Sequence, residues 1–314
     1  MATPRLISER LQALKAQFDR MRSGKDALLV LIDEAEVAES VYNSNAIENS
    51  TLSLPETEKI LLEMEVSRHV SVREVYEAKN LARVMEFIRA LSKDRELSKD
   101  LVCTLHGMFL VGINDAIAGR FRKAGEYVRV GTFIAPAPEH IGLLMDRLLV
   151  EYTSNLRLYP LDAIARFHLE FETIHPFNDG NGRIGRALIN LQLQRIGFPN
   201  IIIRDKEKQD YYRGFKEYRD NKKTRVMERI LTRALCESLH KRLAYLQGEF
   251  IVTLAEYVKE SRLGAPAVFN AARRQTIPAF REKGVWKIGK EYRPPTFLPA
   301  GRQVDRRGVY NRAE

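Results

Sequence analysis

Apolar residues recur at intervals of three and four positions along most of this chain. The interval is clear in the first 25 residues and returns in residues 76–91 and 161–174. Residues at such spacing lie on one face of an α-helix, where they can pack against a core. In the first of these segments they are Leu11, Leu14, Phe18 and Met21. The pattern therefore predicts a mainly α-helical protein whose helices each bury one face.

Residues 119–138 break this helical pattern. The stretch GRFRKAGEYVRVGTFIAPAP alternates apolar and polar positions around Val128 and Val130, and Gly131-Thr132 offers a pivot. Such alternation about a glycine is typical of a β-hairpin, and the two prolines then end the extended segment. One small hairpin is therefore expected inside the helical domain.

The last part of the chain is predicted to form a separate unit. Residues 250–262 are expected to be helical, and two further short helices are interrupted near Pro266 and Pro278. Residues 285–293 alternate like a strand or wing, and three short helices followed by a strand resemble a winged helix-turn-helix. The expected division is an N-terminal helical region (1–100), a core domain (101–245), a winged-helix-like domain (246–293) and a flexible tail (294–314).

Composition adds limits to this picture. Of the 314 residues, 45% are hydrophobic and 29% are charged, which is the balance of an ordinary globular protein. The amino terminus lacks the apolar run of a signal peptide, and the longest apolar run, residues 27–32, is too short to span a bilayer. A cytoplasmic protein with no membrane partner is therefore expected. Cys103 and Cys236 show no metal or disulfide spacing, which predicts two buried, reduced thiols.

The positive charge is concentrated at the carboxyl end. The net charge is +10, and the segment from Lys241 to Glu314 holds 15 Lys and Arg against 7 Asp and Glu, a charge of +8. A basic unit of this kind indicates an acidic partner, nucleic acid being the commonest, and duplex DNA is the candidate; docking of a protein, a homodimer contact or a solvated basic surface are alternatives. The candidate phosphate contacts are Arg273, Arg274, Arg281, Lys283 and Lys287.

The stretch 172-ETIHPFNDGNGRIGR-186 carries the strongest chemical signal. Pro176 is expected to end one helix, and a second helix is expected to begin near Arg183, after Gly180-Asn181-Gly182. The N–H groups of such a loop converge at a helix amino terminus and attract an anion, while glycines let a phosphate approach the backbone closely. The loop therefore predicts a phosphate site.

Charged side chains around this loop extend the prediction. Arg183 and Arg186 lie near one helix face in its first turn, where cations oppose the helix dipole unless an anion compensates, so a polyphosphate is expected. Asp179 offers the hard carboxylate oxygen that Mg²⁺ takes beside phosphates. His175 can accept a proton at neutral pH. Together these groups predict attack of a hydroxyl on a magnesium nucleotide.

The segment HPFNDGNGRIGR resembles, position for position, the Fic-domain signature HxFx(D/E)GNGRxxR. The resemblance implies a Fic fold, a helical bundle with a small β-hairpin flap, and a protein adenylyltransferase that moves AMP from ATP to a Ser, Thr or Tyr hydroxyl of a target protein or of itself. By the same resemblance, Phe177 is a buried anchor. The implied roles are general base for His175, Mg²⁺ ligand for Asp179, phosphate cradle for Gly180, Asn181 and Gly182, phosphate contact for Arg183 and γ-phosphate partner for Arg186.

Two further segments extend the resemblance. The hairpin resembles the flap that aligns a target segment by strand pairing. Tyr211 and Tyr212 resemble the tyrosine pair of the family's nucleotide pocket, with helix packing as the alternative. The residues assigned to the flap are Val130, Gly131, Thr132, Phe133 and Ile134.

The stretch 44-SNAIEN-49 resembles the inhibitory pattern (S/T)xxxE(G/N) of Fic proteins whose inhibitory helix is amino-terminal, known as class II. Its matching residues are Ser44, Glu48 and Asn49. The implied mechanism is competition, because a Glu48 carboxylate paired with Arg186 would occupy the position of the γ-phosphate. An exposed helix carboxylate is the alternative.

Other functions are kept open at this point. The same site could remove AMP from a modified target or transfer a phosphoryl or phosphocholine group, although the intact GNGR argues against the kinase variant. A DNA-binding regulator that acts through the basic carboxyl-terminal unit is the third class.

Overall fold

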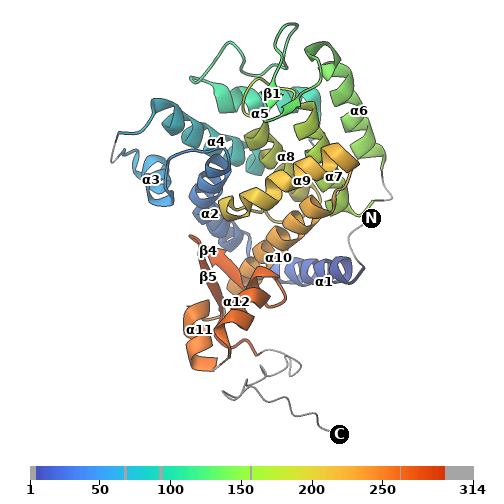
Figure 1. Ribbon diagram of the computed structural model, residues 1–314. Coiled ribbons are helices and arrows are strands. Elements are labelled where there is room, and N and C mark those ends of the chain that lie inside the picture. Colours follow the sequence, from blue (N-terminus) through green and yellow to red (C-terminus); the bar gives the residue numbers. More distant parts are fainter. Residues whose placement is uncertain (1–4, 67–68, 92–94, 156–157, 262, 294–314) are drawn as a thin grey trace, which may run out of the picture.

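The computed structural model describes residues 5–66, 69–91, 95–155, 158–261 and 263–293. Most of these residues are helical, as the apolar spacing predicted, and the helices pack into a bundle (Figure 1). The helices of the bundle are α1 (Arg5–Arg22), α2 (Asp26–Ile47), α3 (Leu54–Glu58), α4 (Val72–Ala90), α5 (Lys99–Leu110), α6 (Ile141–Ser154), α7 (Pro160–Ile174), α8 (Asn181–Arg195), α9 (Lys208–Asn221) and α10 (Arg225–Gln247). They are accompanied by the π-helical η1 (Lys59–Glu63) and the 3-10 turns η2 (Pro138–His140) and η3 (Asp205–Glu207).

The helices α7 and α8 lie between two apolar clusters. Buried side chains of α4, α5, α6 and the hairpin-side face of α7 form the first cluster, which includes Phe171 and Phe177. Side chains of α1, α9, α10 and the opposite face of α7 form the second, which includes Leu169 and Tyr211. Because both faces of α7 and α8 are buried, the loop that joins these helices is fixed from two sides. The predicted anchor Phe177 is fully buried in the first cluster.

The predicted hairpin is confirmed. Strand β1 (Arg129–Val130) pairs antiparallel with β2 (Phe133–Ile134), with Val130 opposite Phe133. Gly131 has a φ of +62°, the left-handed region that a two-residue hairpin turn requires and that glycine adopts at little steric cost. The hairpin lies at the end of the molecule opposite the carboxyl-terminal unit (Figure 1).

The carboxyl-terminal unit differs in part from the prediction. It consists of β3 (Ile251–Thr253), α11 (Leu254–Ser261), α12 (Ala265–Arg273), β4 (Phe280–Glu282) and β5 (Val285–Gly289). Residues 251–253, predicted as helix, form a strand that pairs with β5 in a sheet of order β3-β5-β4. Thr253 then caps α11, because its Oγ1 accepts from the Glu256 amide at 3.2 Å while Glu256 accepts from the Thr253 amide at 2.8 Å. Within the described residues the unit therefore has two helices and a three-stranded antiparallel sheet, not three helices and a strand.

Two of the predicted domain boundaries fall inside helices. The boundary between residues 100 and 101 lies within α5, and the one between 245 and 246 lies within α10. The division into domains stays a prediction, and the predicted tail 294–314 lies outside the described residues.

An ion-pair cluster joins the carboxyl-terminal unit to the bundle. Arg281 of β4 donates from Nη2 to Glu237 Oε2 of α10 at 2.6 Å, and Glu237 also accepts from Arg204 at 3.0 Å. Arg204 reaches Glu39 of α2, which accepts a further bond at 3.0 Å from the amide of Gly284. The cluster thus connects β4 and the β4–β5 turn with α10 and α2.

This cluster corrects the expectation of five phosphate-contacting cations. The Arg281 side chain is only 12% exposed and is bound by carboxylates, so it is not a phosphate contact. Lys283 pairs with Glu58 and Lys287 pairs with Glu282. Arg273 and Arg274, at the end of α12, are exposed. The excess positive charge of the segment is therefore partly neutralised by acids of the bundle.

We expect Arg281→Ala to lower the free energy of unfolding by about 3–5 kcal/mol, because it leaves the buried Glu237 with an incomplete set of partners. Chemical denaturation measures this change. The matched control is Arg273→Ala, an exposed arginine of the same unit, which should alter stability by about 0.5 kcal/mol or less. Equal effects of the two variants would contradict a structural role for the cluster.

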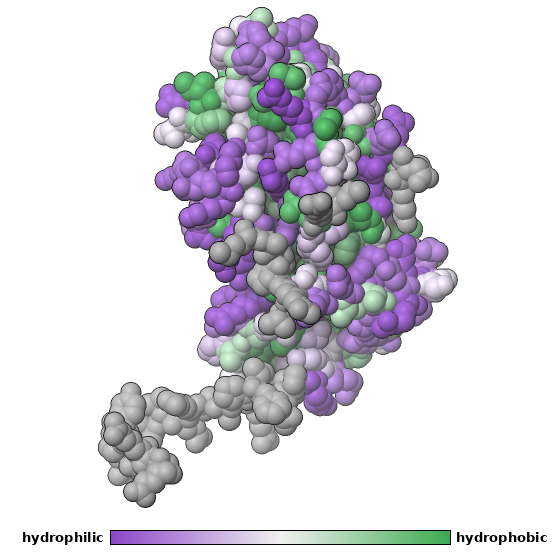
Figure 2. Space-filling view, turned by 90° about the vertical axis from the view of Figure 1, so that its right-hand side faces the viewer, coloured by the Kyte–Doolittle hydropathy of each residue, from purple (hydrophilic) through white to green (hydrophobic). Residues whose placement is uncertain are grey.

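The remaining composition-based expectations concern thiols and membranes. Cys236 is buried and Cys103 is half-buried, so the prediction of two buried thiols is right for one of them, and both are free. Burial raises the pKa of each thiol to about 11. Among the described helices, none combines the length and apolarity needed to cross a bilayer. The face of the molecule in Figure 2 is mainly hydrophilic.

Candidate active site

The α7–α8 loop has the shape that the sequence predicted. α7 ends at Ile174, and the next residue, His175, has a φ of +51° that turns the chain, while its amide still donates to the Phe171 carbonyl at 2.9 Å. Gly180, with φ of +79°, stands immediately before α8. A side chain at Gly180 would approach Phe109 at 3.0 Å, so glycine is needed for both backbone angle and space. The loop therefore brings His175 to the amino terminus of α8.

Asn181 has a different role from the one expected. α8 begins at Asn181, two residues before the predicted start. The Asn181 side chain is buried, donates to the Phe177 carbonyl at 2.8 Å and accepts from the Phe177 amide at 2.9 Å. It thus fixes the loop from within, and only its backbone amide remains for a phosphate.

Arg186 is held by the helix that carries the inhibitory pattern. Its Nε donates to Ser44 Oγ at 2.9 Å, and its Nη2 donates to the Ser44 carbonyl at 2.8 Å and to Glu48 Oε1 at 2.9 Å. Its Nη1 lies 3.3 Å from the hydroxyl of Tyr211. The guanidinium is only 7% exposed. Buried arginine with this many partners is rigidly oriented.

The Glu48 carboxylate lies in the position predicted for an anion. A Cβ built on Gly182 would be 2.1 Å from Glu48 Oε1, so the carboxylate rests against the glycine of the cradle. Burial acts to raise the pKa of Glu48, but Arg186 and Arg183 outweigh it and hold the pKa below its ordinary value. The alternative of an exposed helix carboxylate is therefore excluded. Asn49, at φ of +68°, accepts from Lys208 Nζ at 2.7 Å and ties the end of α2 to α9.

Arg183 has different ion-pair partners from Arg186. It donates to Glu77 at 2.9 Å and to Asp179 at 2.9 Å, and its guanidinium lies 4.7 Å from the centroid of the Phe109 ring. Asp179 also pairs with Arg73 of α4. Sequence reasoning missed Arg73 and Glu77, which lie about 100 positions before the loop and carry no local signal.

Asp179 fits a hard cation that is shared with a ligand. Burial acts to raise the pKa of this carboxyl, but Arg183 and Arg73 hold the pKa below its ordinary value, so Asp179 is ionised. Its side chain is 30% exposed. No group of three or more His, Cys, Asp or Glu in the described part of the chain is arranged to hold a metal. Mg²⁺ here would take one carboxylate and complete its shell with phosphate and water oxygens, as it commonly does.

His175 is a neutral base in this environment. Burial lowers the pKa of its imidazole to about 4, so the ring is uncharged at neutral pH. Nδ1 is buried without a hydrogen-bond partner in the described part of the chain, and Glu172 Oε2 lies 3.8 Å from it. Glu172 was not predicted as a site residue.

The two tyrosines are not equivalent. Tyr211 is buried, and its hydroxyl lies 2.7 Å from His168 Nε2. This contact holds the hydroxyl beside the Arg186 guanidinium. Tyr212 is 41% exposed and donates to the carbonyl of Ile47 at 3.1 Å, beside the inhibitory segment. The packing alternative therefore holds for Tyr211, and Tyr212 is the ring that can face a ligand.

The hairpin lies next to the α7–α8 loop. Gly131, Thr132 and Ile134 are exposed, while Val130 and Phe133 are half-buried, and Arg219 of α9 lies 5.0 Å from the centroid of the Phe133 ring. Arg122, missed by sequence reasoning, is buried and donates to the carbonyls of His175 and Pro136, each at 2.9 Å. Arg122 thus joins the α7–α8 loop to the base of the hairpin.

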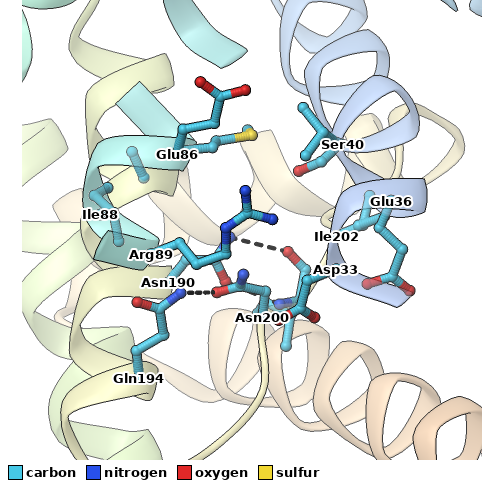
Figure 3. A pocket seen from close by; sticks show the side chains of 14 residues that line it. Asp33, Glu36, Ser40, Glu86, Ile88, Arg89, Asn190, Gln194, Asn200 and Ile202 are labelled. Carbon is cyan, nitrogen blue, oxygen red and sulfur yellow. Dashed lines mark hydrogen bonds between the residues drawn. The ribbon is translucent and has the colours of Figure 1, made fainter. Parts of the chain in front are cut away.

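A separate hollow lies between α2, α4, α8 and residues 200–202 (Figure 3). Gln194 donates to Asn200 at 2.8 Å on its floor, and Asp33, Glu86 and Arg89 line it. It contains no predicted site residue. The position predicted for the γ-phosphate is occupied by the Glu48 carboxylate, which is bound to Arg186.

Comparison with known proteins places this geometry in context. Residues 96–193 match the family model described as the Fic/DOC family. The protein adenylyltransferase fic-1 of Caenorhabditis elegans is 35% identical over 180 residues, 55% of this chain and 34% of that relative. The chain spans about a third to two fifths of the length of such curated relatives.

Two solved structures have a similar fold. A Fic domain containing signaling protein from Bacteroides thetaiotaomicron superposes with a TM-score of 0.70 at 26% identity, over 76% of this chain and 97% of that one. A Fic family protein from Desulfovibrio desulfuricans superposes with a TM-score of 0.66 at 21% identity, over 94% of this chain and 98% of that one. The second likeness concerns the fold alone, and it extends into the carboxyl-terminal unit.

Proposed function

Because residues 96–193 of this chain form a Fic domain, we propose that the protein is an adenylyltransferase that moves AMP from ATP to a Ser, Thr or Tyr hydroxyl of a target protein or of itself. The observation that carries the proposal is the anionic carboxylate of Glu48 against Gly182 and on Arg186, beside a neutral histidine. A site that accepts a carboxylate against Gly182 and on a buried guanidinium also suits phosphate oxygens.

The proposed reaction uses the chain's groups as follows. The target hydroxyl attacks the α-phosphorus of ATP, the bond to the bridging oxygen of the β-phosphate breaks, and pyrophosphate leaves. Because Nδ1 of His175 is buried, Nε2 is the nitrogen that takes the hydroxyl proton. Amides at residues 180–182 and Arg183 bind phosphate oxygens, and Arg186 receives the γ-phosphate. Mg²⁺ on Asp179 would neutralise phosphate charge when bound.

The target segment is proposed to dock on the hairpin. β1 and β2 pair with each other, so each strand of this two-stranded sheet keeps one edge open to an added strand. Exposed Ile134 offers an apolar contact for the segment. Strand pairing would place the target hydroxyl near His175, since Arg122 joins the two elements.

The resting protein is proposed to be inhibited. With Glu48 on Arg186, the γ-phosphate loses its partner and the α-phosphate is misplaced for attack. The release of Glu48 would complete the site.

Label transfer tests the function. ATP labelled at the α- or the γ-phosphate is incubated with Mg²⁺ and the wild-type or Glu48→Gly protein, and labelled protein bands are counted. Label from the α-phosphate alone supports AMP transfer. Label from the γ-phosphate would replace the proposal with phosphoryl transfer, and no label from either would favour AMP removal or another donor.

The finer partner assignments are also proposals. Arg273 and Arg274 are exposed at the end of α12, and we propose this small basic area as a contact for duplex DNA. We also propose a homodimer, which does not depend on these two charges. Unchanged binding to duplex DNA after both arginines become alanine would contradict the proposed DNA contact. Analytical ultracentrifugation measures the oligomeric state and so tests the proposed homodimer. We place the activity in the cytoplasm, which imaging of tagged protein would test.

A further inference from the structure

The catalytic histidine has an acidic neighbour on its own helix. Glu172 and His175 are three positions apart at the end of α7, and Glu172 Oε2 lies 3.8 Å from His175 Nδ1. Among the described residues, neither His175 Nδ1 nor Glu172 Oε1 has a hydrogen-bond partner, although both atoms are buried. The carboxyl oxygen nearest His175 is Oε2, whereas Oε1 lies against Gly185 and His168. Buried polar atoms nearly always have partners, so an unpaired Nδ1 beside this carboxyl group indicates a contact that closes in another state.

The packing around Glu172 is built to hold a carboxyl group. A Cβ on Gly185 of α8 would lie 2.6 Å from Glu172 Oε1 and 3.0 Å from His168 Nδ1. Only glycine at this position lets α8 pass over the carboxyl, although glycine inside a helix costs about 0.5–1 kcal/mol relative to alanine. The space opposite His175 is therefore occupied by an acid that the fold makes room for.

Resting on the proposed function, we propose that Glu172 is a positioning residue for His175. In the transferring state its carboxylate accepts a hydrogen bond from Nδ1–H, which fixes the tautomer that leaves Nε2 free to take the proton of the target hydroxyl. A shortening of about 1 Å brings the observed separation to hydrogen-bond length. The proton that His175 gains then gives an imidazolium beside a carboxylate, which stabilises its charge.

The inhibitory residue acts on this pair as well as on Arg186. Burial and, to a smaller extent, the negative charge of Glu48 raise the pKa of Glu172, Arg186 opposes them, and the resulting pKa is about 8. With Glu48 in place, Glu172 is largely protonated at neutral pH and would donate to Nδ1, which leaves the hydrogen on Nε2. The groups that face Glu172 are Glu48 from α2, His168 and His175 from its own helix, Arg186 from α8, and Tyr211 and Tyr212 from α9.

The test compares Glu48→Gly with Glu48→Gly/Glu172→Gln in the full chain. We expect the second substitution to lower kcat at neutral pH by at least about ten-fold, with the KM for ATP changed by less than about two-fold. The rise of kcat with pH should shift to lower pH, because an ionised Glu172 favours the protonated imidazole and its loss lowers the pKa of His175. Glu170→Gln, on the same helix, is the matched control and should leave both profiles unchanged.

A readout without catalysis separates the two proposals. NMR titration of labelled histidines reports the pKa and tautomer of His175 in both proteins, with His175→Ala for assignment, and thermal unfolding checks the fold. Unchanged kcat, pH profile and tautomer in a folded Glu172→Gln variant would overturn the role of the Glu172 side chain. The hydrogen-bond partner of Nδ1 would then be the backbone carbonyl of Glu172. Absence of AMP transfer by Glu48→Gly would instead contradict the proposed function, and the titration would still decide the role of Glu172.

Discussion

Glu48→Gly should raise AMP transfer by about ten- to a hundred-fold. The substitution removes the carboxylate that occupies Arg186 and leaves the other partners of this arginine, Ser44 and Tyr211, in place. A hydrogen bond between charged groups is worth about 1.5–3 kcal/mol, and this is the energy that ATP must otherwise displace to place its γ-phosphate. Glycine is tolerated because Glu48 follows the last residue of α2.

Initial rates with α-labelled ATP measure the effect. Glu48→Gln separates charge from shape and should fall between wild type and Glu48→Gly. Glu65→Gly, which changes an exposed acid after η1, is the matched control and should leave the rate unchanged. An unaltered rate in folded, ATP-binding Glu48→Gly would show that the contact with Arg186 does not restrain the reaction.

His175→Ala in the Glu48→Gly background should reduce transfer by about 10²- to 10⁴-fold, the usual contribution of a general base. The ring is neutral at pH 7 because burial lowers its pKa to about 4, so the wild-type group is ready to take a proton. ATP affinity should change little, since the proposed phosphate contacts are backbone amides and arginines. Calorimetry of ATP binding and rates of label transfer measure the two quantities separately.

The control for this loss is His140→Ala, an exposed histidine in η2. It should keep the full rate of the Glu48→Gly protein. Transfer by His175→Ala at more than about a tenth of the parent rate would mean that another group or water takes the proton.

The sequence was most informative where chemistry is local. The residues from His175 to Arg186 lie within one loop and one helix start, so spacing alone indicated a phosphate site with a base. Residues that meet only in the folded chain gave no such signal, apart from Glu48, which its resemblance to the inhibitory pattern identified. Arg122 reaches the His175 carbonyl across 53 positions, and Glu77 reaches Arg183 from another helix.

Two errors have simple physical causes. The apolar run at 250–254 suits a strand or a helix, and pairing with β5 decides for the strand. Charge counted along one segment ignores partners elsewhere, and Arg281 finds Glu237 in α10. A high count of cations therefore overstated the surface that nucleic acid could contact.

Helix α2 has two attachments, and this limits how the protein can be dissected. Its carboxyl end carries Glu48, while Glu39 in its middle binds Arg204 and the turn between β4 and β5. In a shortened chain without residues 246–293, the buried acids Glu237 and Glu39 would lose their partners Arg281 and Gly284, and α2 itself would be disturbed. Faster transfer by such a fragment would therefore show that α2 had been disturbed, and not that residues 246–293 regulate the site directly. Point substitutions separate regulation from folding more clearly.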